Sequence, residues 1–421
     1  MGIKGLNAFL RKKSPSCFIE LPSSYFQGKR VAIDSDNVLF RFKCRAWKEI
    51  VDQTDVTTQS IDEDLVRKRF IYHVKYYLIG LLKTGVTPIF VTDGEYIMEK
   101  SKTQLKRRED KQKLIRDAKN MKSSILELDE LDRTPSMITD LRKKMHHLGS
   151  LSREDKDIVL DILSAVGIPV LRATGEGEQL CAMLCIEGKV DAVYSRDSDL
   201  TAFGCPLTIN EPSGYIYNEQ TKLTEEGYKC TTFKPVLRDL QMEYQCFVDL
   251  CIMSGCDFND NIPHLGVGKS YNLLIKHNSI DELPDNLHRR STCVKHETCK
   301  RITEEFENQI DCLNHVRCRE IFKHQPSSEI CQDEIILDIN VVIDELRDRL
   351  QTYGAEDWIK DVVPLYKDLP RPSNDIIEKR PSLQRSKLKL NIIGLKKSSP
   401  KYVDTNRIIK LNLIQHQKLN N

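Results

Sequence analysis

Short apolar segments alternate with longer helical stretches through the first half of the chain. The segments span residues 30–34, 87–93, 168–173 and 190–197, and they are rich in β-branched and other apolar residues. Strands that alternate with helices in this way typically form a parallel sheet. The pattern therefore predicts an α/β fold, with a central, mostly parallel twisted sheet flanked by helices.

Acidic residues stand where these strands end. Three of the segments end in an aspartate, namely Asp34, Asp93 and Asp197. In open α/β sheets the site lies beyond the carboxyl ends of the strands, so we expect these side chains to converge. The fourth segment runs into TGEGEQ, whose glycines permit a tight turn that lets Glu176 and Glu178 face the same crevice.

Two further acids complete the set. Asp199 lies two residues past Asp197, and Asp257 ends the apolar helix FVDLCIMSGCD. At an effective dielectric constant near 20, two like charges ~4 Å apart repel by about 4 kcal/mol, so such a cluster needs cations. Oxygen ligands favour Mg²⁺ or Mn²⁺, and paired ions promote phosphoryl displacement. A single aspartate would be an ordinary cap or turn, but seven indicate phosphodiester chemistry.

Composition narrows the class of protein. Fourteen cysteines are spread over 421 residues without a secretory signal, which favours free thiols in a reducing compartment. The longest apolar candidate, residues 70–82, contains His73 and Lys75 and is shorter than the roughly 18 residues of a membrane helix. The formal net charge is only +2, so any affinity for nucleic acid has to come from local patches.

Six motifs, in order, resemble the flap endonuclease and XPG family of 5′ nucleases: MGIKGL, VAIDSD, FVTDG, GEGEQLCA, YSRDSDLTAFG and CIMSGCDF. The resemblance extends to about residue 280. It implies a PIN-like 5′ nuclease fold with a helical arch and a helix-hairpin-helix (H2TH) module. It also implies a structure-specific enzyme that cuts 5′ flaps or branched DNA in replication or repair. The alternatives are a 5′ to 3′ exonuclease of the same superfamily and, less favoured, an inactive nucleic-acid-binding relative.

The resemblance assigns roles to individual residues. The acids matching the first metal site are Asp34, Asp93, Glu176 and Glu178, and those matching the second are Asp197, Asp199 and Asp257. Lys100 and Arg107 match a basic catalytic pair; two helical turns separate them, so both can face one phosphate. Two Mg²⁺ ions, replaceable by Mn²⁺, would support hydrolysis to 5′-phosphate and 3′-hydroxyl products.

Other segments are expected to contact nucleic acid. The basic stretch from Lys100 to Asn120 predicts an arch that clamps a single-stranded 5′ end, although a solvated helix face would look the same. Gly266, Gly268 and Lys269 open a helix whose amides could hold duplex phosphates, in a module that in relatives often binds K⁺. Taken alone, such a Gly-x-Gly is usually an ordinary turn.

Two residues near the N-terminus match family positions beside the active site. Phe40 stands where relatives place a ring that stacks on a base, although a core phenylalanine is the plain alternative. Gly2 would permit a close approach of the N-terminus, and simple N-terminal processing is its plain alternative.

The remaining sequence is less informative. Asp260 could be an additional carboxylate of the site. The repeat formed by Cys293, His296 and Cys299 and by Cys312, His315 and Cys318 could bind zinc, but it matches no familiar zinc spacing, and buried cysteines are favoured. No sliding-clamp peptide is found.

These features predict five regions, a substrate and a location. The substrate is DNA with a 5′ flap or a branched or gapped structure, and RNA-containing flaps are admissible. The protein is expected to be a monomer in the nucleus, or at the site of DNA replication if it is viral. The regions are an N-terminal nuclease region (1–110), arch and spacer helices (111–150), an internal nuclease region (151–256), a helix-hairpin-helix and C-terminal helical region (257–370) and a basic, flexible tail (371–421).

Overall fold

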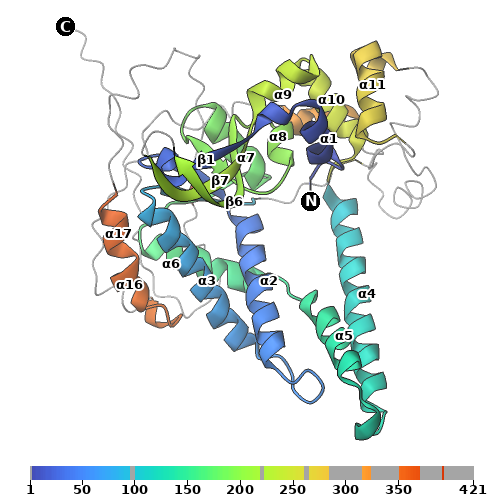
Figure 1. The fold of residues 1–421 in the computed structure, drawn as a ribbon, viewed down its shortest axis with the longest axis vertical. Coiled ribbons are helices and arrows are strands. Elements are labelled where there is room, and N and C mark those ends of the chain that lie inside the picture. The colour runs from blue at the N-terminus through green and yellow to red at the C-terminus, as the bar shows by residue number, and fades with distance from the viewer. Residues whose placement is uncertain are drawn as a thin grey trace.

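A mixed sheet forms the centre of the protein (Figure 1). The computed structural model describes residues 2–94, 100–218, 222–259, 265–283, 315–323 and 350–369, and the backbone of 391–392. Within these residues the sheet has eight strands in the order β1-β7-β6-β5-β2-β3-β4-β8. The strands are β1 (Phe18–Pro22), β2 (Arg30–Asp34), β3 (Thr87–Thr92), β4 (Val170–Arg172), β5 (Ala192–Tyr194), β6 (Leu207–Asn218), β7 (Leu223–Thr232) and β8 (Asn391–Ile392).

The four strands predicted from the sequence are β2, β3, β4 and β5, and they pair in parallel, as expected. β6 extends this parallel set beside β5, whereas β1, β7 and β8 pair antiparallel with their neighbours. The side chains alternate between two apolar layers: Ala32 and Val193 face one core, and Val31 and Ile33 face the other. The expected α/β architecture is confirmed.

Helices cover both faces of the sheet. One core lies against α1 (Leu6–Lys13), α7 (Gly177–Ile186), α8 (Asp199–Ala202), α9 (Phe233–Leu240), α10 (Tyr244–Ser254), α11 (Val267–His277) and α14 (His315–Phe322). The other lies against α2 (Ser35–Gln53), α3 (Glu63–Lys83), α6 (Arg153–Ala165), α16 (Asp357–Asp361) and α17 (Val363–Lys367). Short 3-10 turns are η1 (Pro15–Cys17), η2 (Ser23–Phe26), η4 (Glu130–Asp132) and η5 (Ile280–Glu282).

Two helices form a long hairpin that projects from the body (Figure 1). They are α4 (Ser101–Leu126) and α5 (Pro135–His146), which correspond to the expected arch, although α4 begins ten residues before the predicted region. A small core of Val51, Val56, Ile125 and Leu141 joins this hairpin to the far end of α2. The Trp47 indole N–H also donates to the carbonyl of Met145 at 2.8 Å. These contacts attach the hairpin to α2.

The described C-terminal segments separate onto the two faces of the sheet. The α14 segment is held to α10 by Arg319, whose Nε and Nη2 donate to the Asp249 carboxylate at 2.6 Å each. The segment 350–369 instead packs on the opposite core, where Lys75 lies 2.5 Å from Asp361. The predicted region 257–370 thus contributes to both layers.

Several expectations concern residues outside the described ranges. They are Asp260, most of the Cys/His repeat (Cys293, His296, Cys299 and Cys312) and the tail 371–421 apart from the backbone of β8. The two described members of the repeat have protein partners: His315 Nε2 lies 2.6 Å from Asp281 Oδ1, and the Cys318 thiol lies 3.6 Å from the carbonyl of Phe258. Among the described helices, none combines the length and apolarity needed to cross a membrane.

Candidate metal centre

The predicted acids emerge from neighbouring loops at the carboxyl ends of the parallel strands. Asp34 is the last residue of β2, where it also caps α2 by accepting a hydrogen bond from the Asn37 amide at 3.3 Å. Asp93 follows β3, and Glu176 caps α7 after β4. Because β5, β2, β3 and β4 are adjacent in the sheet, their following loops meet at one edge.

Three acids lie close enough to share one cation. Carboxylate oxygens of Glu178, Asp197 and Asp199 all lie within 4.8 Å of one another. The family resemblance had grouped Glu178 with the first metal site, whereas the structure places it beside the pair expected at the second. The charge of Asp34 also contributes to the raised pKa of Glu178, so Glu178 lies between the two predicted sets of metal-binding acids.

The buried carboxylates repel one another and shift each other's protonation. Burial and the charge of Asp93 raise the pKa of Asp34 to about 7, and the hydrogen bond from Ser195 opposes this rise. Burial and the charge of Asp36 raise the pKa of Asp93 to about 6. Burial, followed by the charge of Asp197, raises the pKa values of Glu178 and Asp199 well above their ordinary range. The cluster therefore needs protons or cations to offset its charge.

The residues present fit a hard divalent cation. The donors that converge here are carboxylate oxygens, which Mg²⁺ and Mn²⁺ prefer. One oxygen of Asp199, Oδ1, is buried and has no hydrogen-bond partner among the described residues. A buried, unpaired carboxylate oxygen is unfavourable unless a cation or water completes its coordination. The site thus has the charge and the free ligand atom that a metal ion would use.

The base of the arch contributes two cations beside the seventh acid. The Lys100 ammonium group pairs with the Glu176 carboxylate and lies 3.8 Å from Asp257 Oδ2. Arg107 Nη2 lies 2.8 and 2.7 Å from the two oxygens of Asp257. Burial alone would lower the pKa of Lys100, but the charges of Glu176 and its neighbours raise it overall. The structure therefore brings both predicted basic residues to one side of the acid cluster.

The N-terminus packs directly against the same cluster. A Cβ atom on Gly2 would lie 2.1 Å from Asp197 Oδ1 and 2.3 Å from Ser198 Oγ, and the Gly2 φ of +94° favours glycine. The amide of Ile3 donates to Ser198 Oγ at 2.9 Å. Only glycine fits this position without a clash. Gly2 lies beside the acid cluster, where the family resemblance implied a close approach of the N-terminus.

The expected nucleic-acid contacts occupy open positions. Phe40 is 41% exposed on α2, so it is not a core residue. Gly266 caps α11, and a Cβ atom on Gly266 or Gly268 would meet no described atom within 4 Å. Lys269 lies in the first turn of α11, which packs against α10, the helix that precedes Asp257. The amino end of α11 is thus sterically accessible.

Sequence reasoning missed residues that hold the acids in place. The Ser195 hydroxyl donates to Asp34 Oδ2 at 2.8 Å and accepts from the Asp197 amide at 3.1 Å. Gly94 lies where a Cβ atom would come within 1.8 Å of the Ala173 carbonyl, so two active-site loops cross there. Asp36 accepts from the Asp93 amide at 2.9 Å. The sequence did contain a signal for Ser195, Gly94 and Asp36, because they lie inside the motifs YSRDSD, FVTDG and VAIDSD, respectively.

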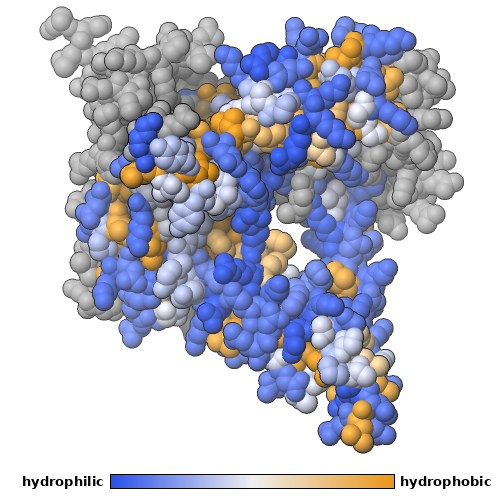
Figure 2. Space-filling model, viewed as in Figure 1, coloured by the Kyte–Doolittle hydropathy of each residue, from blue (hydrophilic) through white to orange (hydrophobic). Residues whose placement is uncertain are grey.

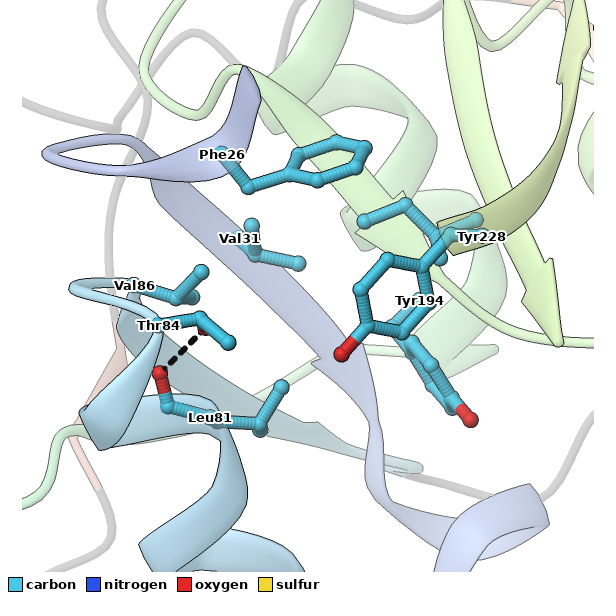
Figure 3. Close-up of a pocket in the computed structure, with 8 residues that line it drawn as sticks. Phe26, Val31, Leu81, Thr84, Val86, Tyr194 and Tyr228 are labelled. Atoms are coloured by element: carbon cyan, nitrogen blue, oxygen red, sulfur yellow. Dashed lines mark hydrogen bonds between the residues drawn. The ribbon is translucent and has the colours of Figure 1, made fainter. Parts of the chain in front are cut away.

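A small apolar pocket is lined by residues other than these acids (Figure 3). Its lining includes Phe26, Val31, Val86 and Tyr228, from the core between the sheet and α3, and Thr84 Oγ1 donates to the Leu81 carbonyl at 2.7 Å. It contains no carboxylate among its lining residues. The pocket therefore shares no lining residue with the acid cluster.

Comparisons with known proteins agree with this arrangement. Residues 1–114 match the XPG N-terminal domain, and residues 167–257 match the XPG I-region. Flap endonuclease 1 of Cryptosporidium muris is 30% identical over 69% of this chain and 58% of its own length. The probable RAD2-like endonuclease 369L of Invertebrate iridescent virus 6 is 26% identical over 65% of this chain and 71% of its own length. The chain spans between half and two thirds of the first flap endonucleases that it matches.

A solved structure supports the same fold. The catalytic core of Rad2 in complex with a DNA substrate has a TM-score of 0.51 and 16% identity, and the match covers 86% of this chain and 100% of that chain. The two family regions contain all seven acids and also Lys100 and Arg107. The neighbouring strands of the sheet bring the acids of these two regions together. The chain belongs to the family of flap endonucleases and XPG-type nucleases.

Proposed function

We propose that the chain is a divalent-metal-dependent, structure-specific 5′ nuclease that cuts 5′ flaps or branched DNA during replication or repair. The observation that carries this proposal is the convergence of buried carboxylates from four neighbouring strand ends, with two arch cations against them. Clustered acids that bind metal ions beside cations that can neutralise a phosphate form the expected machinery for phosphodiester hydrolysis.

In this proposal different acids hold different metal ions. Two Mg²⁺ ions, or Mn²⁺ in their place, would supply Lewis-acid chemistry that lowers the pKa of water and neutralises phosphate charge. Asp34, Asp93 and Glu176 would hold the first ion, and Asp197, Asp199 and Asp257 the second. Glu178, which lies between these sets, would contribute to both sides of the site.

Lys100 and Arg107 would exchange partners when substrate binds. In the free protein they neutralise Glu176 and Asp257, which prevents these acids from repelling their neighbours. The same two basic side chains would donate to the scissile phosphate and stabilise the charge that develops on it. No side chain of the cluster has to act as a nucleophile.

The arch suits a single-stranded 5′ end. In the space-filling view an opening separates α4 from α2 and the body, and the arch surface is predominantly hydrophilic (Figure 2). Exposed cations of α4 include Lys106, Arg108, Lys113 and Lys119. Phosphates attract such a surface without regard to sequence, as a structure-specific enzyme requires. The matching Rad2 core, solved with a DNA substrate, favours DNA as the ligand.

Other contacts complete the proposed substrate site. Phe40, exposed on α2, would stack on a base beside the cut. Gly266, Gly268 and Lys269 would grip duplex phosphates at the amino end of α11, where K⁺ could assist. RNA-containing flaps share the same backbone and are admissible. We infer a monomer that acts in the nucleus or, for a viral member, at the site of viral DNA replication.

The proposal can be tested with a double-flap DNA labelled at its 5′ or 3′ end, in Mg²⁺. The wild type is compared with Asp197→Asn and with Asp157→Asn, a control on α6 whose side chain is exposed and lies 3.8 Å from Arg153. We expect the wild type and the control to release an intact flap, and Asp197→Asn to release none. Mononucleotide ladders would instead establish the exonuclease. Tight binding without cleavage by the wild type would overturn the catalytic proposal.

A further inference from the structure

An eighth carboxylate lies beside the cluster without belonging to the seven family acids. Asp36 is the second residue of α2. Its Oδ2 accepts two hydrogen bonds, one from the Thr92 hydroxyl at 2.9 Å and one from the Asp93 amide at 2.9 Å. Its Oδ1 pairs with the Lys156 ammonium group at 2.5 Å. Both oxygens of Asp36 are therefore already engaged by the protein.

These contacts connect three separate elements at one point. Asp36 belongs to α2, Lys156 to α6, and Thr92 and Asp93 to the end of β3. The side chains of Asp36 and Lys156 are only 28% and 19% exposed, so this pair differs from a surface ion pair that moves freely in water. Because Asp36 accepts hydrogen bonds from the Thr92 hydroxyl and from the Asp93 amide, it fixes the backbone where the chain leaves β3.

Asp93 is consequently held from two directions. Asp36 accepts from its backbone amide, and the Gly177 amide donates to its Oδ1 at 2.8 Å. Gly177 lies between Glu176 and Glu178 in the chain, so the second contact sets the distance between two metal-binding loops. Partners that orient a metal ligand commonly determine metal affinity as strongly as the ligand's own charge does.

Lys156 reduces the repulsion between Asp36 and the neighbouring carboxylates. A further carboxylate next to Asp34 and Asp93 would add repulsion to a cluster that already carries excess negative charge. The ammonium group of Lys156 offsets that charge and leaves Oδ2 of Asp36 free to accept from β3. The pair thus supplies a fixed acceptor, and Lys156 offsets part of the charge with which Asp36 raises the pKa of Asp93.

We propose that Asp36 and Lys156 form a positioning pair that orients Asp93 and thereby sets the metal affinity of the site. This inference rests on the proposed metal-dependent function. Asp36 acts through Asp93 and touches neither the metal ion nor the substrate. A neutral acceptor of the same shape should therefore keep the contacts to β3 and lose the pairing with Lys156, whereas a side chain without an acceptor should lose both.

The test is direct binding of Mn²⁺ to the substrate-free protein, measured by electron paramagnetic resonance of the free ion. We expect Asp36→Ala to weaken binding about 10- to 100-fold. Asp36→Asn keeps an oxygen that accepts from Asp93 and Thr92 but places an NH2 donor against Lys156, so it should weaken binding less than Asp36→Ala does. Asp157→Ala, on the same helix as Lys156 but exposed, is the matched control. Saturating Mg²⁺ should restore most of the kcat of Asp36→Ala.

The outcomes separate this inference from the proposed function. If the wild type binds no Mn²⁺, the proposed function itself fails. If the wild type binds Mn²⁺ and Asp36→Ala binds it equally well, or if Asp36→Asn loses as much affinity as Asp36→Ala, the positioning role is overturned. Should Asp36→Ala not fold, Thr92→Val removes one donor to Asp36 at similar volume; severalfold weaker Mn²⁺ binding supports the role, and unchanged binding overturns it.

Discussion

At the scale of single residues, burial distinguishes the site acids from ordinary surface aspartates. Asp34 and Asp199 are each only 2% exposed, and neither faces a basic side chain as its principal partner. Burial shifts such carboxylates toward their protonated form or toward binding of a cation. The free protein therefore carries a local electrostatic penalty that metal binding would relieve.

This penalty predicts an unusual pH dependence of stability. The pKa of Asp34 is raised from 3.8 to about 7, so between these values the folded protein binds more protons than the unfolded chain, and this group's contribution to stability falls as pH rises. Without metal, Asp34→Asn should therefore unfold at a higher temperature than the wild type at pH 7.5, and the advantage should vanish near pH 4. Thermal unfolding in a chelator measures this; an equal difference at both pH values would contradict it.

Gly2 provides a steric prediction at the same scale. In Gly2→Ala the new Cβ atom would lie 2.1 Å from Asp197 Oδ1, so the N-terminus or the Asp197 loop has to move. We expect cleavage to slow by about 10- to 100-fold, as misplaced catalytic groups typically cause. The control is Gly80→Ala in the interior of α3, where no described atom lies within 4 Å of the added carbon. Equal activity of Gly2→Ala and the control would refute the close approach.

The sequence predicted the metal acids because each is marked locally, by its place at the end of an apolar segment. Asp34, Asp93 and Asp197 needed no knowledge of tertiary structure beyond the parallel sheet. The function of Asp36 could not be predicted, because its partner Lys156 is 120 residues away in the sequence. The grouping of Glu178 with Asp197 and Asp199 likewise depends on how α7 is oriented over the sheet.

At the scale of secondary-structure elements, the arch base is both a structural joint and part of the site. The first two turns of α4 reach Asp257 through Arg107 and through the Thr103 hydroxyl, which donates to the Asp257 carbonyl at 2.8 Å. Movement of α4 would therefore change the position of a proposed metal ligand. If the proposed function is correct, binding of a flap in the arch would be coupled to assembly of the metal site.

Arg107 tests that coupling. Arg107→Gln removes the charge that faces Asp257 and, in the proposed mechanism, one cation at the phosphate, so we expect kcat to fall by about 10- to 1000-fold, the range known for lost transition-state charge stabilisation. Arg108→Gln, one residue along and exposed, should change mainly KM and its salt dependence. Single-turnover cleavage at saturating protein separates the two effects. Identical loss of kcat in both variants would argue against a specific role for Arg107.

The other end of the arch depends on a small apolar joint. Leu141 is fully buried against Val51 and Ile125, so Leu141→Ala should destabilise this joint by about 2–5 kcal/mol and expose α5 to proteolysis. Leu131, which is 100% exposed at the tip, provides the control substitution Leu131→Ala. Limited proteolysis should cut the Leu141 variant within residues 111–150 faster than the control. Equal rates would show that the joint does not hold the arch.

Among the elements, the four central strands were predictable and the sheet edges were not. The parallel strands are buried on both faces, so their residues form nearly continuous apolar runs. The β6–β7 hairpin instead mixes exposed Tyr215 and Tyr217 with glutamates and contains two register shifts, which obscures its alternation. Its place beside β5 follows from tertiary pairing alone.

At the scale of the whole molecule, the sheet separates two cores and presents one chemical edge. The N-terminal segment, the arch, α7 and α10 all reach this edge from different parts of the sequence. The described C-terminal helices instead stabilise the faces of the sheet, through Arg319 on one side and Lys75 on the other. The predicted domain boundaries could not anticipate that division, since both segments are helical and of mixed polarity.

The most direct test of the proposed metal centre is a crystal structure after soaking in Mn²⁺, with anomalous scattering used to locate the ions. The arrangement of the acids predicts two Mn²⁺ peaks, with Glu178 between them. One should contact Asp34, Asp93 and Glu176, and the other Asp197, Asp199 and Asp257. The peak that contacts Asp93 should weaken in Asp36→Ala and persist in Asp157→Ala. Ordered acids without a peak at saturating Mn²⁺, or peaks confined to other surfaces, would contradict a two-metal nuclease centre at this edge of the sheet.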